Sequence, residues 1–254
     1  MSNSDDVSNA ITWFWGSRAS QSGGIAHSQG GSGRDAVVGG QHLNAVRDLI
    51  VDELVKLGAP RAAIHTSGRS KTMPGYFRPT KNWDLAVTNK DGDVVALFEL
   101  KSQVGSFGNN ANNRAEESIG NPTDLMYAVE HGLIPIRPWT AYIYVIQDVK
   151  GSTTRSSNRS STAYPVDEAF SFASYVDRVT LLAERLVAVG LYNAAWIVAT
   201  TMPLSESDNA TWSSPSEKVG WEAFLSALGE FVSYHFDSGP GPGPGPGPGF
   251  EFLS

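Results

Sequence analysis

Apolar residues recur along this chain with the spacing of helices in some segments and of buried strands in others. Over Gln41–Leu57 they return every three or four positions and stop before Gly58, which predicts an amphipathic helix. Trp139–Gln147 and Ala194–Thr200 are almost continuously apolar, as expected of central strands. Further helices are predicted over three segments: Pro122–His131, Val166–Val189 and Pro215–Phe236. The chain is therefore expected to combine helices with a buried sheet.

Two more strands, Trp83–Thr88 and Val94–Leu100, are joined by the turn sequence Asn-Lys-Asp-Gly and predict a hairpin. Its polar residues are unusual, because Asp84 lies in the first strand while Glu99 and Lys101 flank Leu100 at the end of the second. Side chains two positions apart on a strand share a face, and Asp84 can lie beside them across the hairpin. Two carboxylates and an ammonium group can bind Mg²⁺ and hold an attacking water. The hairpin thus predicts a site for metal-dependent hydrolysis.

Two segments have compositions that oppose regular structure. Residues 16–40 are rich in Gly, Ser and Gln and predict a long loop, either disordered or ordered by a partner. Residues 239–254 begin with strict Gly-Pro alternation and predict a disordered tail, which leaves residues 1–238 as a single domain.

Residues 1–9 are expected to be frayed, and Ile11–Trp15 to end a first helix whose aromatic side chains pack on the core.

The composition limits the class of protein. The 254 residues, 41% of them apolar, can supply a substantial core. The absence of cysteine excludes disulfides, thiolate metal sites and cysteine nucleophiles. With no signal sequence and no apolar run long enough to span a bilayer, we expect a soluble, cytoplasmic protein without a membrane partner. The net charge of −7 argues mildly against non-specific coating of nucleic acid, but local charge is more informative.

Three polar regions are candidates for contact with nucleic acid. The stretch from Lys56 to Lys81 contains no acidic residue, so a phosphate backbone could lie there. Asn and Arg after the hairpin could read bases or could form the first turn of a helix. A later basic loop suits phosphate contact as well as inert surface. The candidates are Arg69, Lys71, Arg78 and Lys81; Asn109, Asn110, Asn112, Asn113 and Arg114; and Arg155 and Arg159.

Other patterns are weaker. Glu53, on the first amphipathic helix, either belongs to a solvated face or reaches toward Asp84 as an extra acidic group near the metal. Asp148-Val149-Lys150 repeats the acid-x-Lys form after another apolar strand, but its nearest upstream acid, Glu130, falls in a predicted helix. The histidines lack metal-ligand spacing, and no Gly-x-Ser-x-Gly, zinc-finger or helix-turn-helix signature is present. The Asp84 hairpin remains the strongest candidate site.

Several of these motifs together resemble the XhoI family of type II restriction endonucleases, within the PD-(D/E)xK nuclease superfamily. They are Asn82-Trp83-Asp84, Phe98–Gly105, Phe107–Arg114 with Glu116-Glu117, and the earlier Phe14–Gln21 and Gly33–Gly40. The resemblance extends from about Phe14 to the last helix. Trp83 stands where the superfamily motif has Pro, a departure that is common.

The resemblance implies a restriction-endonuclease-like α/β core, with a central mixed β-sheet flanked by helices. It implies a homodimer that cuts double-stranded DNA at CTCGAG after the first C, leaving 5′ overhangs and 5′-phosphate ends, in a bacterium that holds a cognate DNA methyltransferase. Asp84, Glu99 and the Leu100 carbonyl would bind Mg²⁺, and Lys101 would position or deprotonate the water. The alternatives are a structure-selective repair nuclease and a catalytically inactive DNA-binding protein on the same fold.

Overall fold

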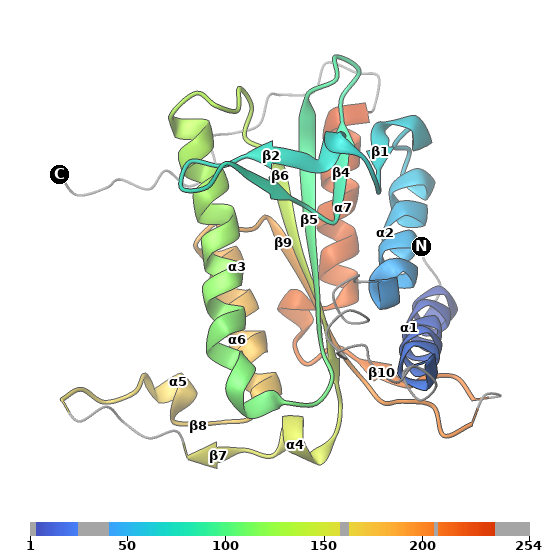
Figure 1. The fold of residues 1–254 in the computed structure, drawn as a ribbon, viewed down its shortest axis with the longest axis vertical. Coiled ribbons are helices and arrows are strands. Elements are labelled where there is room, and N and C mark those ends of the chain that lie inside the picture. The colour runs from blue at the N-terminus through green and yellow to red at the C-terminus, as the bar shows by residue number, and fades with distance from the viewer. Residues whose placement is uncertain (1–3, 25–40, 158–162, 206–207, 237–254) are drawn as a thin grey trace.

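A sheet of six strands lies at the centre of the computed structural model, which describes residues 4–24, 41–157, 163–205 and 208–236 (Figure 1). In spatial order the strands are β1 (Ile64–His65), β4 (Leu85–Thr88), β5 (Val94–Gln103), β6 (Trp139–Gln147), β9 (Ala194–Thr200) and β10 (Trp212–Ser213). Strands β5, β6 and β9 are parallel, whereas β1, β4 and β10 pair antiparallel with their neighbours. The sheet is therefore mixed, and β5 lies where its antiparallel and parallel parts meet.

Helices cover both faces of this sheet (Figure 1). On one side lie α1 (Ser4–Gly24), α2 (Asn44–Lys56) and α7 (Trp221–Phe236); on the other lie α3 (Phe107–Glu130) and α6 (Tyr175–Ala188). Because strand side chains alternate, Phe98 and Leu100 of β5 pack in the core beneath α1, α2 and α7, whereas Leu97 packs in the core beneath α3 and α6. The expected fold, an α/β sheet flanked by helices, is confirmed.

Shorter elements complete the described chain. β2 (Thr72–Pro74) and β3 (Thr80–Asn82) form a small hairpin, and β7 (Ser156–Ser157) pairs with β8 (Phe172–Ala173). The short helices are η2 (Gln41–Leu43), η3 (Arg61–Ala63), η4 (Arg69–Lys71), η5 (Glu217–Val219), α4 (Lys150–Thr153) and α5 (Glu168–Ser171). The β2–β3 hairpin matters most for function, because it leads directly into β4 and the segment that carries Asp84.

The prediction of a loop over residues 16–40 is wrong for its first part. Helix α1 continues to Gly24, and it begins at Ser4 in a stretch expected to be frayed. The helix is held by packing, since Val7, Ile11, Phe14 and Trp15 are buried against the core. Residues 25–40 and the Gly-Pro tail lie outside the described residues.

Three predicted helices have different bounds. The predicted helix Pro215–Phe236 begins only at Trp221, as α7, after the short helix η5. Helix α3 begins at Phe107 and runs through Pro122, where the sequence predicted a helix start. Buried Ala111, Leu125 and Ala128 lie on both sides of this proline, so packing on the sheet outweighs the lost backbone hydrogen bond. The predicted helix Val166–Val189 is divided into α5, β8 and α6, because Ser174 caps a new helix by accepting a hydrogen bond from the Asp177 N–H.

The aromatic residues of α1 do not all pack inward. Trp13 is 70% exposed, while Trp15 is 4% exposed and donates its indole N–H to Thr200 Oγ1 at 3.1 Å. We expect Trp15→Phe to lower the free energy of unfolding by about 1–2 kcal/mol, since it removes a buried hydrogen bond and leaves a small void. The same change at Trp13 should cost less than about 0.5 kcal/mol. Urea denaturation of both variants makes the comparison, and equal losses would contradict the packing of α1.

Candidate active site

Asp84 lies beside Glu99 at the start of the β4–β5 pair. The register pairs Leu85 with Phe98, and Asp84 directly precedes Leu85, near enough to Glu99 for their charges to interact. The Asp84 N–H donates to the Phe98 carbonyl at 3.1 Å, and Asp84 Oδ2 accepts from the Leu100 N–H at 2.7 Å. The carboxylate thus takes the place of a backbone acceptor just before β4 begins. One backbone and one side-chain hydrogen bond therefore hold Asp84 against β5.

Glu99 is fully buried and is surrounded by donors. Its Oε1 lies 2.6 Å from Lys101 Nζ and 3.3 Å from Asn121 Nδ2, and its Oε2 lies 2.8 Å from Lys81 Nζ. A buried carboxylate is tolerated only when it is paired in this way. The two ammonium groups come from different elements, β5 and β3, and Asn121 comes from α3.

The position of Asp84 next to Glu99 shifts the pKa of its carboxyl group. Burial and the like charge of Glu99 raise the pKa of Asp84, and they outweigh the opposing effects of the Leu100 N–H, Lys101 and Lys81. A carboxylate held next to another in this way is stabilised in its charged form by an added cation. A cation bound at Asp84 would offset the repulsion between Asp84 and Glu99.

Lys101 is held in its charged form. Burial alone would lower the pKa of Lys101, but the charge and hydrogen bond of Glu99 and the charges of Glu117 and Asp84 raise it overall. Glu117, on α3, lies 3.9 Å from Lys101 Nζ and 2.7 Å from Arg114 Nη1. Lys101 is thus an ammonium at neutral pH, directed at Glu99.

A tight turn directs α3 onto this side of the sheet. Gly105 and Ser106 both have left-handed backbone conformations, with φ of 68° and 52°, and reverse the chain between β5 and α3. Gln147 accepts from the Gly105 N–H at 3.1 Å, which fixes the turn to β6. Consequently α3 carries Glu117 and Asn121 past Lys101 and Glu99.

The β2–β3 hairpin is anchored to α3 by Asp124, which is 4% exposed. Its Oδ1 accepts from the Tyr76 and Phe77 N–H groups at 2.9 and 2.7 Å, and its Oδ2 accepts from Arg78 Nε at 2.7 Å. Burial raises the pKa of Asp124, but the Phe77 and Arg78 hydrogen bonds and the remaining contacts lower it overall. Gly75 is required here, because a Cβ would meet Asp124 Oδ2 at 2.5 Å. Asp124 therefore fixes the hairpin that carries Lys81.

The donors present fit a hard divalent cation. The described residues include no group of three or more His, Cys, Asp and Glu side chains suited to a metal, so two carboxylates are what the chain offers here. Mg²⁺ commonly uses one or two carboxylates together with waters and substrate phosphates. The N–H and C=O of a strand residue point to the same side, so the Leu100 carbonyl is directed toward Asp84 as well. Asp84, Glu99 and this carbonyl could hold the ion.

Sequence comparison with known proteins identifies the family of this chain. The sequence matches the model of the restriction endonuclease XhoI family over residues 20–214. The chain belongs to this family. It is 40% identical over 186 residues to the type II restriction enzyme XhoI of Xanthomonas vasicola, covering 71% of this chain and 73% of that protein. The expected family and enzyme class, a type II restriction endonuclease, are confirmed.

Two further type II restriction enzymes are similar to this chain. The type II restriction enzyme BstVI of Geobacillus stearothermophilus is 36% identical over 172 residues, which covers 65% of this chain and 76% of that protein. AbrI of Azospirillum brasilense, another type II restriction enzyme, is 38% identical over 171 residues, which covers 61% of this chain and 75% of that protein. No solved structure matches. None of the described helices is long and apolar enough to cross a membrane.

The basic residues expected to contact DNA differ in their surroundings. Arg69 is exposed on η4, and Lys71 donates to the Trp83 carbonyl at 2.8 Å. Arg78 is bound by Asp124 and donates to Asn121 Oδ1 at 2.9 Å, so it supports the hairpin. Lys81 lies on Glu99 inside the candidate site. Only Arg69 of these four presents an exposed cation beside the site.

The Asn-rich segment is helical. Asn109, Asn110, Asn112, Asn113 and Arg114 all lie in the first turns of α3, so the prediction of a helix N-terminal turn is confirmed and that of a loop is wrong. Asn112 Oδ1 accepts from Arg178 Nη2 at 2.9 Å, Asn113 is exposed, and Arg114 is paired with Glu117. Arg155 is exposed and paired with Asp177, and Arg159 lies outside the described residues. The first turns of α3 lie at the end of that helix opposite the β2–β3 hairpin (Figure 1).

Glu53 is not brought to the site. It is 3% exposed on α2, on the opposite face of the sheet from Glu99, and its Oε1 lies 2.8 Å from Lys56 Nζ. Lys56 also binds Asp6 of α1 at 2.8 Å. The carboxylate therefore helps to join two helices, and the prediction that Glu53 approaches Asp84 does not agree with its position.

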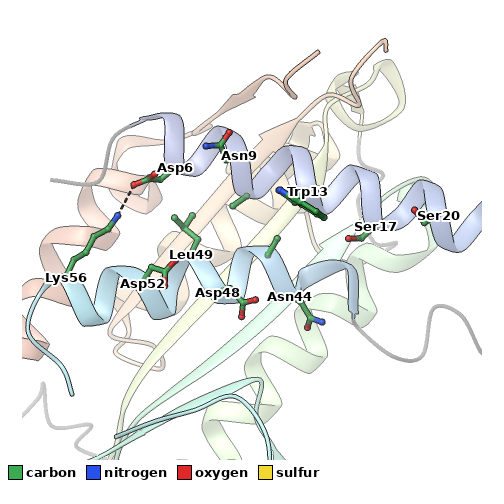
Figure 2. A pocket seen from close by; sticks show the side chains of 12 residues that line it. Asp6, Asn9, Trp13, Ser17, Ser20, Asn44, Asp48, Leu49, Asp52 and Lys56 are labelled. Atoms are coloured by element: carbon green, nitrogen blue, oxygen red, sulfur yellow. Dashed lines mark hydrogen bonds and ion pairs between the residues drawn. The ribbon is translucent and has the colours of Figure 1, made fainter. Parts of the chain in front are cut away.

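A hollow of about 740 Å³ also lies on that opposite face, between α1 and α2. Figure 2 shows Asp6, Asp48, Asp52 and Lys56 around it, with Trp13 along one wall. Three of these side chains are acidic, which suits a phosphate backbone poorly. The hollow is therefore separate from the Asp84–Glu99 site in place and in charge.

Sequence reasoning missed Asn121, Asp124 and Glu117 as parts of the site. Asp124 and Asn121 fall in the predicted helix or just before it, with spacing that marks no motif. The one available signal was that both are polar residues close to the buried face of that helix. The contacts of Asn121 and Asp124 are with residues 22 to 48 positions away in the sequence, which no local pattern reveals.

Proposed function

We propose that this chain is a Mg²⁺-dependent, homodimeric endonuclease that cuts both strands of DNA at CTCGAG after the first C, leaving 5′ overhangs with 5′-phosphate ends. The observation that carries the proposal is that Asp84 lies beside Glu99, and that Lys101 Nζ lies 2.6 Å from Glu99 Oε1. A relative 40% identical to this chain bears the name of the type II restriction enzyme XhoI, which supports the choice of site.

Asp84, Glu99 and the Leu100 carbonyl are the proposed metal ligands. When bound, Mg²⁺ supplies positive charge that offsets the charge developing on the scissile phosphate. Asp84 is held next to Glu99 by its hydrogen bond from the Leu100 N–H, so the two carboxylates are adjacent before an ion binds. The buried side chains around Glu99 limit the access of bulk water, which strengthens each electrostatic interaction.

Lys101 is proposed to orient the attacking water. Without a metal ion, the charges of Glu99, Glu117 and Asp84 raise the pKa of Lys101, so that it is an ammonium able to donate to a water. An ammonium group can donate to the water and to a phosphate oxygen at once. Glu117 lies at the outer side of Lys101 and would restrict its motion.

The dimer and the partner follow from the proposed sequence specificity. A two-fold protein reads a two-fold sequence, so two copies of this chain would present one site to each strand. Exposed Arg69, Asn113 and Arg155 are proposed DNA contacts, together with Asn109, Asn110 and Arg159. Host DNA would need protection, which a cognate methyltransferase of the same specificity provides.

The direct test is digestion of a plasmid that contains one CTCGAG sequence, with Mg²⁺ and with EDTA, followed by sequencing of the ends. We expect a single Mg²⁺-dependent linear product with 5′ overhangs inside CTCGAG. A matched plasmid with one base pair of that sequence changed is the control, and it should remain uncut.

Other outcomes separate the components of the proposal. Discrete cuts at another sequence would retain the enzyme class and reject the CTCGAG specificity. Nicking without sequence preference would favour a structure-selective nuclease, and binding without cutting would favour an inactive DNA-binding protein. Equal cutting in EDTA would reject the metal.

A further inference from the structure

Both carboxylate oxygens of Glu99 are occupied by ammonium groups. Lys101 Nζ binds Oε1 at 2.6 Å, and Lys81 Nζ binds Oε2 at 2.8 Å. The Lys81 side chain is only 18% exposed and also donates to the Asn82 carbonyl at 3.0 Å. A cation coordinated by Glu99 must share or replace one of these contacts.

Lys81 belongs to the β2–β3 hairpin, which is separate from the six-stranded sheet. It lies in β3, opposite Met73 of β2, and its ammonium group is 5.3 Å from the centroid of the Trp83 ring. The hairpin is fixed to α3 by Asp124 and to Trp83 by Lys71. This position is therefore supported by several independent contacts.

The basic segment that precedes Lys81 in the sequence favours transfer of its ammonium group to a DNA phosphate. Arg69 and Lys71 lie on η4, directly before the same hairpin, and no acidic residue occurs from Lys56 to Lys81. A DNA backbone bound along this basic segment would bring phosphate oxygens near Lys81. An ammonium group with three donors can exchange one anionic acceptor for another without a change in its charge.

We propose that Lys81 couples metal binding to DNA binding: without DNA it occupies Glu99 Oε2 and competes with the divalent cation, and with DNA it moves to a backbone phosphate and frees that oxygen. This inference rests on the proposed function. It adds a positioning residue that responds to substrate. By linkage, DNA then raises metal affinity by the same factor by which the metal raises DNA affinity.

The physical reason is competition for one carboxylate. Removal of the Lys81 charge leaves Glu99 with Lys101 and Asn121 as its partners and removes the repulsion between an ammonium and a dication. Metal affinity in the absence of DNA should therefore rise. The further gain on adding DNA should become smaller, because part of the competition has already gone.

The test measures Mn²⁺ binding by electron paramagnetic resonance of free Mn²⁺, on full-length protein with and without a CTCGAG duplex whose scissile linkages resist hydrolysis. We expect Lys81→Met to bind Mn²⁺ about tenfold more tightly than wild type without DNA, and to show a smaller DNA-induced gain. Lys90→Met removes the same charge from the exposed β4–β5 turn and should change Mn²⁺ affinity less than about twofold.

Circular dichroism first establishes that the variants fold, and Lys81→Gln serves as a second neutral variant. Unchanged or weaker Mn²⁺ binding in a folded neutral variant would overturn the role of Lys81. If wild type cuts CTCGAG while that result is obtained, only this inference fails. If wild type neither cuts DNA nor binds Mn²⁺, the proposed function fails, and the inference with it.

Discussion

Lys101→Ala is expected to lower the rate of CTCGAG cleavage by about 10³-fold or more, equivalent to about 4 kcal/mol of transition-state stabilisation. Lys101 has the contacts for this role, since its ammonium group lies 2.6 Å from Glu99 and faces the proposed metal ligands. Its removal leaves the attacking water without its donor and Glu99 without one of two charged partners. Single-turnover cleavage of a labelled duplex measures the chemical step.

Asp84→Asn is expected to have an effect of the same size, because a neutral amide binds a divalent cation poorly. Fluorescence anisotropy with Ca²⁺ should show duplex binding by Lys101→Ala close to that of wild type. Lys150→Ala is the matched control: Asp148-Val149-Lys150 has the same sequence form, but Lys150 is exposed on α4. Cleavage retained by Lys101→Ala or Asp84→Asn would reject the site.

The Asp84→Asn variant also separates catalysis from folding. A group with a raised folded-state pKa loses its stabilising contribution as pH rises through that pKa, so ionised Asp84 destabilises the metal-free protein at neutral pH. We therefore expect Asp84→Asn to be more stable than wild type without metal, by about 0.5–2 kcal/mol. A less stable variant would leave loss of fold as an explanation for lost cleavage.

Asp124→Ala is the second large expected effect, with a loss of about 3–5 kcal/mol in the free energy of unfolding. The change removes the acceptor of two backbone N–H groups and leaves the Arg78 guanidinium without its carboxylate. Cleavage should fall as well, since Arg78 donates to Asn121 and Asn121 donates to Glu99. Urea denaturation and the cleavage assay measure the two losses separately.

Asp48→Ala provides the control for Asp124. Asp48 is paired with Arg47 at 2.8 Å, but its side chain is 60% exposed, so its loss should cost less than about 0.5 kcal/mol. Gly75→Ala tests the same anchor without changing any charge, because the added Cβ would crowd Asp124 Oδ2. Equal stability of Asp124→Ala and Asp48→Ala would contradict the role of Asp124.

The contribution of Asp124 to the free energy of unfolding depends on pH in a defined direction. The pKa of Asp124 is lowered in the folded protein, so its contribution to stability is present above the unfolded pKa of about 4 and is lost as pH falls through the folded value. The difference between wild type and Asp124→Ala should therefore shrink on acidification.

Local sequence determined the catalytic candidates because they lie on two strands joined by a short turn. The two-residue repeat of a strand places Glu99 and Lys101 on one face, and the turn brings Asp84 beside Glu99. The apolar runs that became β6 and β9 were equally readable, since a central strand is buried on both faces. The resemblance to the XhoI family depends on the same short motifs.

Tertiary packing decided the features that local preference opposed. Helix α1 forms where the sequence predicted frayed residues because Val7, Ile11 and Phe14 have a core to cover. Helix α3 passes through Pro122 because buried Ala111 and Leu125 lie on both sides of it. For Glu53 the sequence left two interpretations open, a solvated face or a position near Asp84. Neither agrees with the structure, where Glu53 is 3% exposed on α2 and paired with Lys56.

The sequence alone therefore predicted the acid pair and the lysine of the motif, because those residues lie within about twenty positions of one another. It indicated the family through motifs spread from Phe14 to Glu117. Only the tertiary structure placed Lys81 and Asn121 against Glu99, and Asp124 against Arg78 of the β2–β3 hairpin. Their positions depend on how α3 and the β2–β3 hairpin pack together across the sheet edge. That arrangement is set by contacts between distant segments, which residue spacing does not encode.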